Sequence, residues 1–131
     1  MRKTYLVVSV VWAIFIGITS LIPASGFPSL RLSLALPTDK IVHFVFYFVL
    51  TFLLLQVFKP NLKQNSNKLA LKLLLTLIIV FFYGSLIELI QLLTFVHRKS
   101  DVLDVITNIA GELSGFVFFI ILNFNLLKQK L

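Results

Sequence analysis

The amino-acid sequence predicts an all-α polytopic membrane protein, a bundle of four transmembrane helices. The chain of 131 residues is 59% hydrophobic and only 13% charged, which is more apolar than an average soluble domain. Its mean hydropathy is +1.02. The apolar residues gather in four long runs, and shorter segments rich in polar residues or Pro separate them. These observations together favour a membrane bundle over a packed soluble core.

Each run is close to the roughly 20 residues that a helix needs to cross a bilayer. In chain order the runs cover residues 4–22, 41–58, 73–96 and 104–127. The connection between the first two runs carries Leu at alternate positions between prolines, which fits either an interfacial strap or an irregular loop. The polar segment 59–68 is expected to be a loop. No second domain or internal repeat is evident, so residues 1–131 are expected to form one transmembrane domain.

The positive residues predict the orientation of the bundle, because cytoplasmic loops are enriched in Lys and Arg. With the N-terminus inside, eight such residues fall on the cytoplasmic side and four on the other. The eight are Arg2, Lys3, Lys59, Lys63, Lys68, Lys72, Lys128 and Lys130, and the four are Arg31, Lys40, Arg98 and Lys99. Both termini are therefore expected to be cytoplasmic. The first run also fits a signal peptide, but its length favours a retained helix.

Several classes of function are excluded by what the sequence lacks. The chain has no Cys, so it has no disulfides, thiolate metal sites or cysteine nucleophiles. It contains no Gly-rich phosphate loop, GxSxG elbow or zinc-binding helix. The net charge is +7, and the Lys and Arg residues that produce it lie at the ends of apolar runs and form no single patch. This distribution indicates the lipid bilayer, and not nucleic acid, as the partner. No metal or cofactor is expected.

Polar side chains enter the apolar runs at a definite depth. Three stretches of fifteen residues contain neither a charged residue nor His, and they are residues 44–58, 73–87 and 113–127. Fifteen helical residues cover about 22 Å of an apolar core that is about 30 Å thick. The first polar groups beyond these stretches are His43, Glu88 and Glu112. They are expected at one level, just below the outer face.

More polar residues extend this level along one face of each helix. The resulting stripes are Asp39, His43 and Tyr47; Glu88 and Gln91; and Asp101, Asp104, Asn108, Gly111 and Gly115. Ionisable side chains are costly in lipid and turn inward to find partners. The three stripes are therefore expected to face one another around an outward-opening vestibule.

Some of these residues also have a structural interpretation. Asp39 and Asp101 fit helix capping as well as a site. Gly111 and Gly115 are spaced as in helix packing. Glu112 lies beside its stripe, and a hydrogen bond to a neighbouring helix is one interpretation of it.

Glu88 and Gln91 are harder to explain as a pair that only holds helices together by hydrogen bonds, because smaller residues such as Ser and Thr would serve that purpose. A functional role is therefore favoured for Glu88.

Three segments carry a resemblance to a known family. DKIVHFVFY (39–47), ELIQ (88–91) and RKSDVLDVITNIAGELSG (98–115) resemble, in order, the motifs of the VanZ-like family of small membrane proteins. The matching positions are Asp39, Lys40, His43, Tyr47, Glu88, Gln91, Arg98, Asp101, Asp104 and Asn108. The resemblance implies a bacterial plasma-membrane protein. The namesake of the family is associated with resistance to the glycopeptide teicoplanin, and the resemblance implies no mechanism for it.

Two functions fit these patterns. The first is a site at the outer leaflet that binds or modifies a lipid-linked or cell-envelope molecule, such as a lipid-linked envelope precursor, with His43, Glu88 and Asp104 as the catalytic acid and base groups. Arg98 would hold an anionic head group and is expected to pair with Glu88, Asp101 or Asp104. The expected ligand-binding residues are Asp39, Tyr47, Gln91, Arg98, Asp101 and Asn108.

The second function is that of a non-enzymatic structural or interaction protein whose polar cluster only holds the helices together. A conducting transporter is disfavoured, because the three apolar stretches leave no polar path to the cytoplasm. Whether a reaction is catalysed stays open at this stage.

Overall fold

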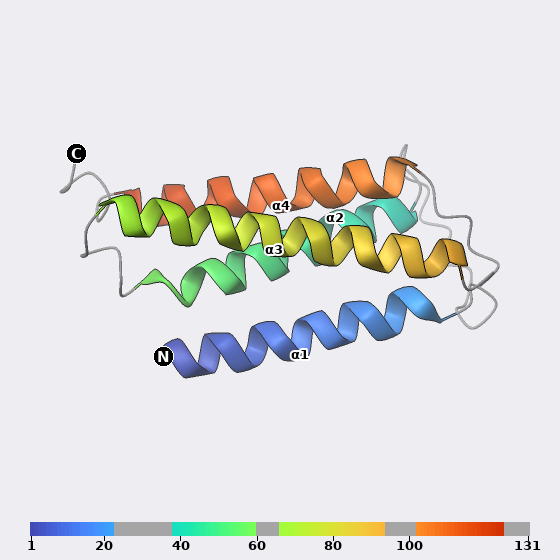
Figure 1. Cartoon of the computed structure of the whole chain (residues 1–131), viewed down its shortest axis with the longest axis horizontal. Coiled ribbons are helices and arrows are strands. Elements are labelled where there is room, and N and C mark those ends of the chain that lie inside the picture. The colour runs from blue at the N-terminus through green and yellow to red at the C-terminus, as the bar shows by residue number, and fades with distance from the viewer. Residues whose placement is uncertain (23–37, 60–65, 94–101, 125–131) are drawn as a thin grey trace.

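Four long helices lie roughly side by side along one axis (Figure 1). The computed structural model describes residues 1–22, 38–59, 66–93 and 102–124. The helices are α1 (Arg2–Leu21), α2 (Thr38–Gln56), α3 (Ser66–Leu93) and α4 (Val102–Leu122). Each is long and apolar enough to cross a membrane, and the described residues contain no strand. The predicted fold class, an all-α bundle of four membrane-spanning helices, is confirmed.

Helix α3 begins earlier than its apolar run suggests. It starts at Ser66, whereas the hydropathy pattern places the start of the run at residue 73, so the expected loop 59–68 is shorter. Leu69 explains the extension, because it is buried against Leu55 of α2 and Phe119 of α4. Packing of Leu69 therefore extends the helix into a segment whose Lys and Asn residues lower the mean hydropathy, so the hydropathy pattern does not predict a helix there. The expected continuations 94–96 and 125–127 lie outside the described residues.

Helices α2 and α4 meet at the level of their backbones. A Cβ at Gly111 would overlap the carbonyl oxygen of Phe44, and one at Gly115 would lie 2.5 Å from the carbonyl oxygen of Phe48. The expectation that this small-residue pair packs helices is confirmed. Among the described helices, α2 and α4 share the most extensive contact, and this contact fixes the register of their polar stripes.

Helix α1 is more peripheral, and only Ser9, Ile16 and Ser20 are buried along it. Side chains that donate to backbone carbonyls connect it to the other helices. The bonds are Trp12 Nε1 to Phe46 O (3.1 Å), Tyr83 hydroxyl to Ala13 O (2.5 Å) and Gln91 Nε2 to Ser20 O (2.6 Å). The attachment of α1 therefore depends on a few specific hydrogen bonds.

One end of the bundle carries the predicted site residues His43, Glu88, Asp104 and Asn108, and we call it the polar end. Helices α1 and α3 finish there, and helices α2 and α4 begin there (Figure 1). Arg2 of α1 and Leu122 of α4 lie at the other end. The antiparallel order thus brings together the helix ends that carry the sequence-predicted site.

Candidate functional site

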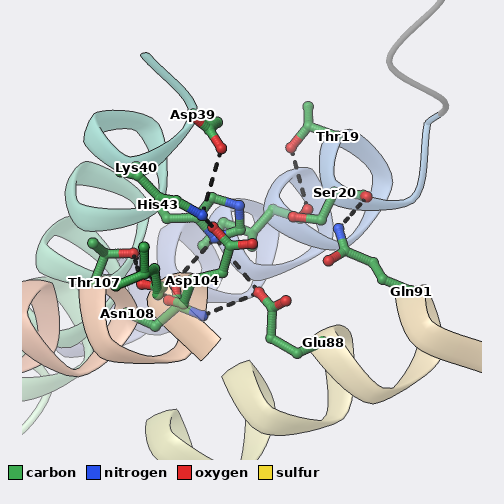
Figure 2. Close-up of polar contacts among 12 residues, drawn as sticks. Thr19, Ser20, Asp39, Lys40, His43, Glu88, Gln91, Asp104, Thr107 and Asn108 are labelled. Carbon is green, nitrogen blue, oxygen red and sulfur yellow. Dashed lines mark hydrogen bonds and ion pairs between the residues drawn. The ribbon is translucent and has the colours of Figure 1, made fainter. Parts of the chain in front are cut away.

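Side chains from three helices meet just inside the polar end. His43 of α2 places Nδ1 3.0 Å from Oδ1 of Asn108 in α4, and Asn108 donates through Nδ2 to Oε1 of Glu88 in α3 at 3.3 Å. The same Glu88 oxygen lies 3.6 Å from His43 Nδ1. We call these three residues the three-helix cluster (Figure 2). Each is only 4–5% exposed, so the sequence-predicted meeting of His43, Glu88 and Asn108 is realised.

The hydrogen bonds of Asn108 determine how His43 is presented. Because the amide nitrogen of Asn108 donates to Glu88, its carbonyl oxygen faces His43. A carbonyl oxygen only accepts, so Nδ1 of His43 carries the proton in this arrangement. In the neutral imidazole Nε2 is then the acceptor. No described residue forms a hydrogen bond with Nε2, which leaves that lone pair for a ligand.

Nearer the end of the bundle, Lys40 of α2 bonds to the Asp104 carboxylate of α4. The side chains of Lys40 and Asp104 are only 12% and 9% exposed, whereas Asp39, 3.6 Å from Lys40, is 45% exposed. Asp104 lies in the first turn of α4, where a negative charge is also favoured by the helix dipole. This pair balances charge above the three-helix cluster and ties α2 to α4.

Gln91 forms a hydrogen bond to helix α1. Its amide nitrogen donates to the carbonyl oxygen of Ser20 near the end of α1 at 2.6 Å, and the side chain is 3% exposed. The side chain points toward α1 (Figure 2). This bond joins α3 to α1, and the expected ligand-binding role of Gln91 stays a prediction.

A second polar level lies one helical turn deeper. Tyr47 of α2 is 1% exposed, and its hydroxyl group has no hydrogen-bond partner in the described part of the chain. A Cβ at Gly84 of α3 would lie 3.0 Å from the Tyr47 ring. Glu112 of α4 is 5% exposed and lines a small pocket together with Tyr47, Gly84 and Asn108.

The expected level of Glu112 is wrong. It lies one turn below the level of His43 and Glu88, and Asn108 takes the place at that level. The prediction assumed that all three apolar stretches begin at the same depth in the membrane. The glycine contact between α2 and α4 instead pairs the two helices so that Asn108, and not Glu112, lies beside His43. No hydrogen bond connects Glu112 to another helix among the described residues, which disfavours the structural interpretation of this residue.

Two predicted site residues, Arg98 and Asp101, lie outside the described residues. The expected ion pair of Arg98 thus stays a prediction. Within the described ranges, no group of three His, Asp or Glu residues is arranged to hold a metal ion.

Lys40 and Glu112 are the site residues that the sequence-based selection passed over. Lys40 stood in a matched motif, and its place one turn before His43 was the available signal. Glu112 follows Asn108 by four residues, which puts it on the same face of α4. That spacing was the signal for a second polar level.

The chain was also compared with known proteins. A family model described as VanZ/LLP1 matches residues 4–123, which covers all four helices and both polar levels. Searches of curated proteins and of solved structures gave no significant match.

Proposed function

The chain belongs to the VanZ/LLP1 family, and we propose that it binds a lipid-linked or cell-envelope molecule at the polar end of its membrane bundle. The observation that carries the proposal is the three-helix cluster, in which a base, a carboxylate and an amide from three helices meet within 3.6 Å. Such groups are expensive in a membrane. Their convergence on one point favours a site over scattered interhelical contacts.

The chemistry of the proposed site centres on Nε2 of His43. Asn108 and Glu88 hold the ring from the Nδ1 side, so a hydroxyl or N–H group of the ligand donates to Nε2. Glu88, next to Nδ1, stabilises the positive charge that His43 gains if it takes that proton. The cluster can therefore orient a ligand and, where a reaction occurs, accept a proton from it.

The proposed orientation places the polar end at the outer leaflet, because the Lys and Arg residues favour cytoplasmic termini. A lipid-anchored envelope molecule reaches such a shallow site directly from the membrane. In that orientation, cysteines introduced at Asn65 and Ser100 are expected to react with impermeant reagents from opposite sides. Labelling of both from outside intact cells would reject the orientation without removing the site.

An architectural role is the second candidate. The observation that favours it is that polar side chains at this end bond to neighbouring helices, as Gln91 does with Ser20 and Lys40 with Asp104. In that case the cluster holds the helices in register and binds no ligand.

Replacement of Glu88 by Gln tests the proposal. The substitution keeps size and hydrogen-bonding capacity but removes the negative charge beside His43. We propose that the wild-type chain raises the teicoplanin tolerance of a bacterial host. We expect Glu88→Gln to lose most of that increase, with membrane insertion and thermal unfolding close to wild type.

Thr51→Val is the matched control, since Thr51 is fully buried in α2 and lies two turns from His43. It is expected to leave tolerance unchanged. A fully tolerant Glu88→Gln host would favour the architectural role. Mass spectrometry of molecules that co-purify with the wild type, and not with His43→Leu, would identify the ligand.

A further inference from the structure

The side of α4 that faces α3 borders an open apolar groove. Phe81 and Phe82 of α3 and Ile109 and Leu113 of α4 are among its lining residues. Phe82 and Leu113 are 65% and 52% exposed, so lipid chains have direct access to the groove in a membrane. Glu112 is the one ionisable residue that lines it.

At its inner side the groove adjoins the pocket between α2, α3 and α4. Glu112 lines both spaces, while Tyr47 and Gly84 line the pocket alone. The free volume of the pocket is about 10 Å³ and that of the groove about 290 Å³. The pocket therefore has room for a single hydroxyl group, about the size of one water molecule, and the groove has room for a chain attached to it.

The pocket holds two polar groups that have no partner among the described residues. They are the Tyr47 hydroxyl and the Glu112 carboxyl group, on side chains 1% and 5% exposed. Tyr47 is the middle residue of α2 and Glu112 the middle residue of α4. At that depth the bilayer supplies no water to satisfy them. A molecule that enters through the lipid can supply this partner.

We propose that groove and pocket form a mid-membrane binding site for a neutral single-chain amphiphile, a long-chain alcohol. The hydrocarbon chain lies along Phe81 and Leu113, and the hydroxyl group enters the pocket and bonds to Glu112 and Tyr47. A hydroxyl group suits them because it both donates and accepts hydrogen bonds. A charged head group is disfavoured at this depth. The site does not rest on the proposed function, since it lies deeper and opens sideways.

Dicyclohexylcarbodiimide, a neutral apolar reagent, tests access to the site. The O–H of a carboxylic acid adds across one C=N bond of the reagent, and the acyl group then moves to nitrogen. The resulting N-acylurea contains every atom of both reactants, so the protein gains the full mass of the reagent. With the full chain in liposomes, we expect peptide mass spectrometry to show Glu112 modified at least tenfold faster than Glu88.

Glu88 is the matched control, because it is equally buried but hydrogen-bonded and lines neither the groove nor the pocket. Leu113→Trp fills the groove and should slow the modification of Glu112 several-fold. Ile106→Trp, at an equally exposed position of α4 outside the groove, should not. Hexadecanol should protect Glu112, whereas hexadecane, which has the same chain without the hydroxyl, should not.

Three results would overturn the proposal. Equal modification of Glu88 and Glu112 would show that the groove gives no privileged access. Equal protection by hexadecane and hexadecanol would leave an apolar groove without a polar site. Modification of Glu112 that falls as the protein-to-lipid ratio rises would indicate that a second copy of the chain covers the groove.

Discussion

The two sides of helix α4 differ in what they leave between helices. Toward α2, Gly111 and Gly115 let the backbones approach until the carbonyl oxygens of Phe44 and Phe48 occupy the space of a side chain. Toward α3, Glu112 borders a pocket and an open groove. One side of the helix is closed to any ligand, and the other has room for one.

This difference shows how a bundle of only four helices can be both stable and accessible. Close contact between α2 and α4 holds two of the polar stripes in register, down to the bond between His43 and Asn108. Because that contact stabilises the pair, α3 does not have to pack tightly along its whole length. Cavities that can hold a ligand are therefore expected between α4 and α3, and the contact that stabilises the bundle is expected between α4 and α2.

The largest expected effect is at the closed side. Gly111→Leu places a side chain where the Phe44 carbonyl lies, and a backbone carbonyl has little freedom to move aside. We expect the free energy of unfolding to fall by about 3 kcal/mol or more, at the upper end of the cost of overpacking. Thermal unfolding in detergent measures the loss.

Ala110→Leu adds comparable bulk at the neighbouring, exposed position and is the control. Its effect should stay within about 0.5 kcal/mol, as for other surface substitutions. Equal losses for the two variants would contradict the closed contact between α2 and α4.

The second prediction contrasts two glutamates of similar burial. Glu88→Leu leaves the amide of Asn108 without its acceptor and should lower the free energy of unfolding by about 1–3 kcal/mol, the cost of an unsatisfied buried group. Glu112→Leu removes a carboxyl group that has no hydrogen-bond partner among the described residues. It should raise the same free energy by a similar amount.

Opposite signs in denaturant unfolding of the two variants would confirm that one glutamate is paired and the other is not. A loss of stability for Glu112→Leu would show that its carboxyl group is already satisfied in the resting protein. That result would also remove the basis for a ligand in the pocket.

The sequence is sufficient to predict the fold because hydrophobic length alone defines membrane helices. It does less well at helix ends, as the start of α3 shows, where Leu69 is buried behind a polar face. Hydropathy averages over a helix surface, whereas burial depends on which residues face inward. The helices were therefore predictable and their boundaries were not.

The candidate site was predictable to within one helical turn. Spacing identified His43, Glu88 and Asn108, and these three meet. The depth of Glu112 was not predictable, since it follows from the glycine contact between α2 and α4 and not from the length of an apolar stretch. The hydrogen-bond partner of Gln91 was also not predictable. It is a backbone carbonyl of α1, and no pattern of side chains in the sequence indicates which carbonyl a side chain will bind.

The smallest expected effect lies outside α4 and gives a reference for the others. Gln91→Leu removes the bond to Ser20 and should cost about 0.6 kcal/mol, the average for side-chain hydrogen bonds between membrane helices. Tyr83→Phe removes the bond to Ala13 and should cost about as much. The two positions are eight residues apart, about 12 Å along α3, so their effects should add in thermal unfolding of the double variant. If Gln91→Leu instead abolished co-purification of the ligand without changing stability, Gln91 would belong to the ligand-binding site and not to the attachment of α1.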